Sequence, residues 1–456
     1  MFKKIEIWIL YLVILFGIIF AVVFGVLVRQ ELVGSVKAGW LSKMALELAE
    51  IPANLKTILK GLNSDLAVDD RFPNLKGFDG KPNNEESYLL LSRYDGDLAE
   101  GIVELVNLTN FEVLHSWNPD LDKFNGLVEK VDEYKYLDRD RRDSRHILIH
   151  PKLTEDNGLL FGQFIPFTKI NSCSELVHQN THDLFHHSIE SDIEGNIWFP
   201  SQMYPQSLPA KKVGRKLVSE GGFTDDAIVK LSPKGDILFE KSVSQIFIEN
   251  GLEYLIFSIG GDGRNLDIDP IHLNDIQPVN FDSDFWKSGD VFLSLRNQSM
   301  VLLYRPSTNE IIWKGTGPFF AQHDVDILDD HRISVFNNNS KDYINGAEIE
   351  NHSEVIIYNF RTNKYLPYQN ESLAKHSVKT LSQGRSEILP NGDMLIEETD
   401  YGRTLYFNSD GSLRWTHVNR AENGRVYIVG WSRILYTKDD IQLVKGFLDN
   451  KGSCNE

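Results

Sequence analysis

A ten-residue spacing between a histidine and an aliphatic residue recurs along this chain and constrains its fold more than any other feature. In each case a polar turn lies between the two, as Gly195-Asn196 does after His187. The three pairs are His187 with Ile197, His323 with Ile333, and His150 with Leu160. Because each unit begins with a chemically capable side chain, the pattern predicts a circular repeat fold whose site lies at its hub.

Pairs of aliphatic strands joined by short polar turns fill the chain from residue 84 onward. DAIVKLSPKGDILFEKSV and TLYFNSDGSLRWTHV, for example, each have a turn near the middle. Two such hairpins make one four-stranded blade, and six units start near residues 84, 146, 182, 267, 321 and 383. We therefore expect an all-β fold, a six-bladed β-propeller, over residues 84–445, followed by a polar tail over residues 446–456.

The segment from Ile7 to Val28 carries no charged residue and is long enough to cross a membrane. A helix rises about 1.5 Å per residue, and a hydrocarbon core is roughly 30 Å thick. Lys3 and Lys4 precede the segment, and this basic bias predicts a cytoplasmic N-terminus. Residues 1–30 are thus expected to form an inner-membrane anchor and residues 31–83 a helical neck. The propeller would then lie in the periplasm or the extracellular space. A cleaved signal peptide is the alternative for the apolar segment.

The formal charge of −18 and the pI of about 5.2 argue against a nucleic-acid partner, because that function needs a basic surface. Two cysteines, Cys173 and Cys454, are too few for a disulfide framework or a thiolate metal site. They either pair with each other or remain free thiols. The residues predict neither a metal nor another cofactor.

Polar side chains gather where the innermost strands of the units are expected to line a central channel. They are His186, His187, His272, Asn274, Arg296, His323 and Arg385. Such a set suits an anionic tetrahedral group, because arginine offers a fork of charged donors and histidine acts as donor, nucleophile or general acid. A neutral imidazole can also attack an electrophilic sulfur or phosphorus centre. His150, by contrast, is interpreted as a structural histidine.

Three runs of sequence resemble the bacterial arylsulfotransferase family. They are DPIHLNDIQP at 269–278, GPFFAQHDVDIL at 317–328 and HHSIESDIEGNIWF at 186–199, with further support from GRSEILPNGDMLIEETDYGR at 384–403. The resemblance implies an exported six-bladed propeller that moves a sulfuryl group from a phenolic sulfate ester to a phenolic or other hydroxyl acceptor. The resemblance further implies that no nucleotide sulfate donor is involved. It also implies that His323 is the nucleophile and is transiently sulfated.

By the same resemblance, the chemistry is ping-pong and four side chains support the sulfuryl group and the leaving phenolate: His187, His272, Asn274 and Arg296. His186 and Arg385 are expected to bind the substrate, although Arg385 equally suits a brace of the channel. Two other function classes stay open. One is a metal-dependent propeller hydrolase with the histidines as ligands, and the other is an inactive, membrane-anchored binding platform. A homo-oligomer is compatible with all three.

Overall fold

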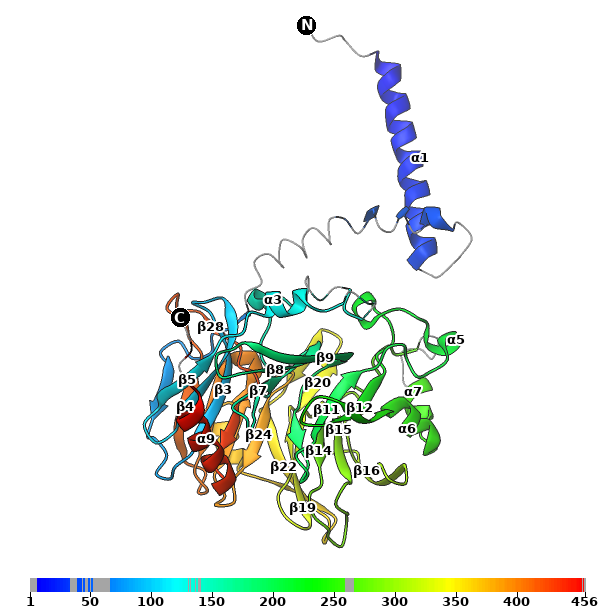
Figure 1. The fold of residues 1–456 in the computed structure, drawn as a ribbon. Coiled ribbons are helices and arrows are strands. Elements are labelled where there is room, and N and C mark those ends of the chain that lie inside the picture. Colours follow the sequence, from blue (N-terminus) through cyan, green and yellow to red (C-terminus); the bar gives the residue numbers. More distant parts are fainter. Residues whose placement is uncertain are drawn as a thin grey trace. The chain divides into compact units, whose positions relative to one another are not determined.

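The structure is a computed structural model of the chain (Figure 1). It describes residues 6–32, 39–42, 44–45, 48–49, 51, 66–129, 131, 133–135, 137, 141–258, 266–452 and 454. The chain divides into two compact units, Met1–Ser64 and Asp65–Glu456. Each unit is described by itself.

The first unit contains the apolar helix α1 (Ile7–Leu32). In the described part of the chain, α1 is the one helix that is long and apolar enough to cross a membrane, and a signal sequence would meet the same criteria. Much of the predicted neck, notably residues 33–38 and 52–65, lies outside the described residues. The described residues between 40 and 51 are helical.

Antiparallel β-sheets in a propeller-like arrangement make up the second unit (Figure 1). Two four-stranded sheets follow the chain order: β14 (Leu273–Pro278), β15 (Val291–Leu295), β16 (Met300–Arg305) and β17 (Glu310–Gly315), then β18 (Asp324–Ile327), β19 (Arg332–Asn337), β22 (Glu354–Asn359) and β23 (Lys364–Pro367). The hairpin of β20 (Ser340–Tyr343) and β21 (Gly346–Ile349) is inserted between β19 and β22. Strands such as β15 are buried along their whole length, because both faces of the sheet are covered.

Two further sheets join distant parts of the chain. One has the order β24 (Arg385–Ile388), β25 (Met394–Glu398), β26 (Arg403–Phe407), β27 (Leu413–Val418) and β2 (Gly77–Gly80). The other has the order β29 (Arg433–Leu435), β3 (Tyr88–Asp95), β4 (Glu100–Asn107) and β5 (Glu112–Trp117). In addition, β1 (Ala67–Val68) pairs with β28 (Val426–Tyr427). Residues 67–80, placed by prediction in a helical neck, therefore contribute two strands to the β unit.

The largest sheet has eight strands and covers two of the predicted units. Its members are β6 (Lys152–Leu153), β7 (Leu159–Phe161), β8 (Ile165–Ile170), β9 (Leu176–Phe185), β10 (Glu190–Ser191), β11 (Ile197–Gln202), β12 (Asp226–Leu231) and β13 (Ile237–Ser242). β9 and β11 join its two halves through the pairs Ser201–Phe185 and Gln202–Leu184. Strand pairing thus separates four blades of four or five strands from this larger sheet, and it does not establish the predicted count of six.

Face-to-face packing of the sheets forms a closed circle. Leu293 packs with Ile228 of the eight-stranded sheet, while Phe292 on the opposite face packs with Val325. The circle continues from Phe336 to Ile396, from Leu395 to Leu89, and from Leu90 to Phe161. Each sheet therefore buries both faces against its neighbours, which leaves short, protected edges.

The second unit also contains short helices. They are α3 (Leu121–Gly126), α5 (Ala210–Val213), α6 (Val243–Glu249), α7 (Tyr254–Phe257), α8 (Asn370–Lys375) and the longer α9 (Lys438–Asn450), with 3₁₀ turns at Asp143–Arg145, Val218–Glu220 and Thr399–Tyr401. α9 packs Phe447 on Trp117 of β5, and it overlaps the start of the predicted polar tail. Beyond it, Cys454 forms a disulfide with Cys173, which settles the open question about the two thiols.

Candidate active site

The chain enters six strands through the same kind of turn. Within three residues before each strand, a non-glycine residue adopts a left-handed conformation with φ between 47° and 60°. The residues are His150 before β6, His187 before β10, His272 before β14, Ala321 before β18, Gln383 before β24 and Trp431 before β29. This conformation is costly for residues with a Cβ, and such strain concentrates at functional sites.

Aromatic side chains at these turns meet. Between ring centroids, His187 lies 5.8 Å from His272, 6.1 Å from His323 and 5.8 Å from Trp431. Nδ1 of His187 is 2.7 Å from Nδ1 of His186. The structure therefore brings His186, His187, His272 and His323 together, and we call these four residues the histidine cluster. All are buried except His272, whose side chain is 30% exposed and connects the cluster to solvent.

His323 is held in one tautomer. Its Nδ1 lies 2.7 Å from Oδ1 of Asn338 and 3.1 Å from the carbonyl of Ala321, and two acceptors at this nitrogen require that it carry the proton. Nε2 accepts a hydrogen bond from the backbone N–H of Gln383 at 2.8 Å. Asn338 is itself fixed, because its Nδ2 donates to the carbonyls of Thr380 and Gln383. The lone pair of His323 is thus on Nε2, the nitrogen opposite the Asn338 contact.

Burial favours the neutral form of three imidazoles in the cluster, those of His186, His187 and His323. Burial, followed by the charge of His272, lowers the pKa of His186 to about 3. Burial likewise holds the pKa values of His187 and His323 well below the usual value. For His323 the next causes are the positive charges of Arg296 and His272. A neutral imidazole is the form that can attack an electrophile.

Asp269 orients His272. One carboxylate oxygen, Oδ2, lies 2.5 Å from Nδ1 of His272, so the other ring nitrogen is the one that can act on a ligand. A histidine held by a carboxylate is a common form of general acid or base. Sequence reasoning missed Asp269 because a spacing of three residues carries no signal outside a helix.

Several buried polar atoms in the described part of the chain have no hydrogen-bond partner, and three of them lie on Arg296, Trp431 and Asn274. Nε of Arg296 and Nε1 of Trp431 are donors, and Oδ1 of Asn274 is an acceptor. The Arg296 guanidinium is close enough to lower the pKa values of both His187 and His323. Since buried donors normally have partners, two unused N–H groups beside the cluster are what an anionic ligand requires.

Arg385 makes a different set of contacts. Its Nη1 is 2.8 Å from Nε2 of His150, and its Nη2 donates to Glu387 at 3.1 Å. Nε lies 4.0 Å from Asp324, whose carboxylate also accepts the backbone N–H of Ser386 on the next inner strand. These contacts engage both Nη atoms of Arg385, while its Nε has no hydrogen-bond partner in the described part of the chain. His150 is buried in this network, and its ring lies 5.7 Å from that of Trp431.

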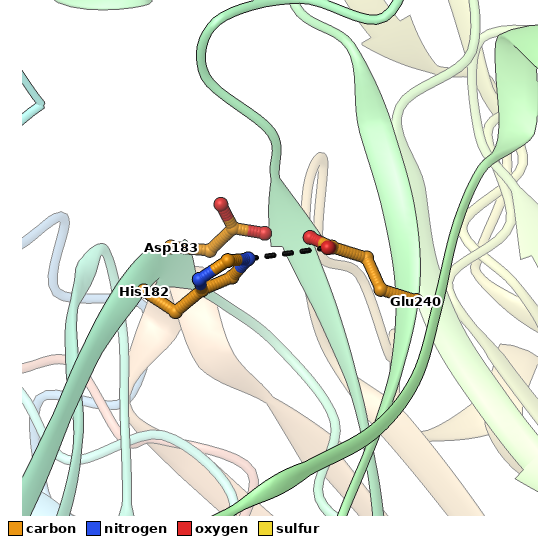
Figure 2. Close-up of side chains that lie close together, drawn as sticks. All are labelled: His182, Asp183 and Glu240. Atoms are coloured by element: carbon orange, nitrogen blue, oxygen red, sulfur yellow. Dashed lines mark hydrogen bonds and ion pairs between the residues drawn. The ribbon is translucent and has the colours of Figure 1, made fainter.

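Two groups of side chains in the described ranges have ligand atoms close enough to hold one metal ion, and both consist of residues outside the histidine cluster. Figure 2 shows the first, where His182, Asp183 and Glu240 converge. Nε2 of His182 is 3.1 Å from Glu240, and burial together with the Glu240 carboxylate raises the pKa of Asp183 to about 8. The second group is Asp329, Asp330 and His331.

Among solved structures, the chain is similar to a protein of unknown function from Bacteroides caccae, at 11% identity and a TM-score of 0.43, over 76% of this chain and 98% of that one. It is also similar to the WD40 β-propeller domain of Doa1, at 12% identity and a TM-score of 0.38, over 80% of this chain and 96% of that one. A streptogramin B lyase matches at 10% identity and a TM-score of 0.35, over 78% and 96%. Scores this low carry no argument about function.

The sequence comparison is more informative. No curated protein matches the chain significantly, but the sequence model of the arylsulfotransferase (ASST) family matches residues 151–420, which is more than half of the chain. The matched segment contains the whole histidine cluster. We conclude that this chain belongs to the arylsulfotransferase family.

Proposed function

We propose that this protein transfers a sulfuryl group from a phenolic sulfate ester to a phenolic or other hydroxyl acceptor, through a sulfated His323. The observation that carries the proposal is the state of His323: a buried, neutral imidazole whose proton is held at Nδ1 by Asn338. The nucleophilic lone pair is therefore on Nε2. Family membership supports sulfotransferase-like activity, and the contacts around His323 support the proposed mechanism.

In the first step, Nε2 of His323 forms a bond to sulfur while the bond from sulfur to the aryl oxygen breaks. The leaving phenolate takes a proton from the imidazolium form of His272, whose positive charge the carboxylate of Asp269 stabilises. In the second step, neutral His272 accepts the proton of the acceptor hydroxyl. The acceptor oxygen then bonds to sulfur as the N–S bond breaks, which returns both histidines to their starting states.

The backbone N–H of Gln383 occupies the lone pair of Nε2 in this structure. Attack on sulfur requires that hydrogen bond to open, and we propose that the N–H then donates to a sulfuryl oxygen. The unpartnered N–H groups of Arg296 and Trp431 are suited to the other oxygens. Donors that stabilise developing negative charge in a site without water are usually the largest contribution to such catalysis.

His187 and Asn274 complete the proposed site. His186 acts on the substrate indirectly, because the contact between its Nδ1 and Nδ1 of His187 positions His187. For Arg385 we propose the brace role, because its guanidinium is engaged by His150 and Glu387.

We propose six blades, because Phe167 and Leu160 in one half of the eight-stranded sheet pack on Phe199 and Val229 in the other half, as separate blades do. We also propose that residues 1–30 anchor the chain in the inner membrane with the N-terminus in the cytoplasm. The catalytic domain, predicted as residues 84–445, would then lie in the periplasm.

The test is the mass of the intact protein after incubation with 4-nitrophenyl sulfate and no acceptor. We expect the gain of one sulfuryl group, which peptide mapping locates to residues 317–328. His323→Asn should abolish the gain, and His331→Asn, which changes a histidine outside the cluster, should retain it. A sulfuryl group on serine or threonine, or an unlabelled wild-type protein that turns over the donor, would contradict the sulfohistidine mechanism.

A further inference from the structure

A cavity of about 410 Å³ shares one wall with the histidine cluster. Its lining includes Leu184, Gln202 and Phe164, together with the guanidinium-bearing residues Arg141 and Arg145. Leu184 and Gln202 are partners across β9 and β11, and Leu184 lies two residues before His186. The cavity therefore sits beside the strand ends that deliver His186 and His187.

Phe164 is the side chain common to the cavity and the cluster. Its ring stacks on His186, with 5.2 Å between centroids and an interplanar angle of 16°, and it lies 6.2 Å from His187. Arg141 places its guanidinium carbon 4.8 Å from the centre of the same ring. Phe164 also adopts φ of 56°, a strained conformation for a bulky residue, so its position is maintained against a conformational cost.

The lining combines an aromatic surface with two guanidinium groups, and this chemistry selects for an aromatic ring that carries a negative charge. Each guanidinium has five N–H donors in a planar fork, so it can bind a carboxylate and still keep a contact within the protein. Among the described residues of the lining, Glu133 is the one acidic side chain beside the two arginines.

We propose that this cavity binds the acceptor, and that the acceptor is a phenol bearing a carboxylate. The ring packs on Phe164 and the carboxylate binds Arg141 and Arg145. Phe164 lies 6.2 Å from His187, and His187 is 6.1 Å from His323, so aromatic contacts lead from the cavity to the proposed sulfohistidine. The acceptor role rests on the proposed sulfuryl transfer, whereas binding of the anionic phenol does not.

The experiment compares two ligands of the same size and carbon skeleton, the anion 3-(4-hydroxyphenyl)propanoate and its neutral amide. Calorimetry on the full chain in detergent should show at least about tenfold tighter binding of the carboxylate, because charged hydrogen bonds are lost in the amide. In Arg141→Gln and in Arg145→Gln the ratio of the two affinities should fall toward one. Arg361→Gln, which removes an exposed guanidinium paired with Asp330, should keep the wild-type ratio.

Equal binding of the two ligands by the wild-type protein would overturn the proposal, and so would an unchanged ratio in the Arg141→Gln/Arg145→Gln double variant with a wild-type melting temperature. Failure of the proposed function looks different. If the protein prefers the carboxylate but never gains a sulfuryl group, the binding site is supported and the transfer mechanism is contradicted. If the protein gains the sulfuryl group but shows no preference for the charged ligand, the transfer mechanism is supported and the proposed acceptor site is contradicted.

Discussion

Removal of the Cys173–Cys454 disulfide should destabilise the β unit measurably. The bond joins residues 281 positions apart, and closure of so long a loop restricts the unfolded chain. The loop-entropy relation gives about 5.6 kcal/mol at 25 °C for this separation. Removal of native disulfides typically costs about 2–5 kcal/mol, so we expect a loss in that range for Cys173→Ser or Cys454→Ser.

The corresponding change in melting temperature is small because the unit is large. For about 390 residues, the entropy of unfolding is near 0.8 kcal/mol/K, so a loss of about 2–5 kcal/mol lowers the melting temperature by about 2–6 °C. The contacts that remain near the bond set the lower end of this range. They include the hydrogen bond from Ser172 Oγ to the Lys451 carbonyl at 2.7 Å and the packing of Phe447 on Trp117.

Scanning calorimetry of the wild-type protein with and without dithiothreitol, and of both serine variants, provides the assay. The reduced wild-type protein should have the same melting temperature as the variants, and reductant should not change the melting temperature of the variants. If oxidised and reduced wild-type proteins melt within about 1 °C of each other, the long loop contributes no stability and the reasoning is wrong.

Two further predictions concern charge. Asp269→Asn should lower kcat for sulfuryl transfer by about 10²-fold or more, because the 2.5 Å contact to Nδ1 of His272 loses its negative partner; an unchanged kcat in steady-state assays would exclude the His272 proton shuttle. Burial lowers the pKa of His417 to about 3, so between about pH 6.5 and 3 the unfolded chain binds a proton that the folded chain does not. Stability is therefore lost as the pH falls, by at most about 1.4 kcal/mol per pH unit from this residue. His417→Leu should remove that slope, and denaturant titrations that give parallel pH curves for variant and wild type would contradict it.

The sequence predicted the β-propeller-like class and the residues of the histidine cluster because both depend on local signals. Strand and turn patterns are visible within about ten residues, and His187, His272 and His323 occur in recognisable runs. Contacts between distant segments could not be read in this way. Trp431 reaches the cluster only because β29 pairs with β3, more than three hundred residues earlier in the chain, and Asn338 contacts His323 across a hairpin.

Other differences have similar causes. The sequence favours a structural role for His150, but no motif around it shows that a left-handed turn places this histidine against Arg385. β1 and β2 are too short to show periodicity, which is why residues 67–80 were assigned to the neck. The cysteines could be paired only from coordinates, since a disulfide depends on the separation of two Cα atoms, here 5.4 Å, and not on spacing along the chain.

The pairing of β29 with β3 has a consequence for biosynthesis. Because the chain is synthesised from its N-terminus, β3 is made long before β29. Only then can Arg433–Leu435 pair with Leu90, Leu89 and Tyr88. Until that docking, Trp431 is absent from its place next to His187 and the circle of sheets is open. Nascent or truncated chains that lack the last few dozen residues therefore have every predicted catalytic side chain but lack Trp431 and the closing strand, so we expect the proposed sulfuryl transfer only from chains that include β29.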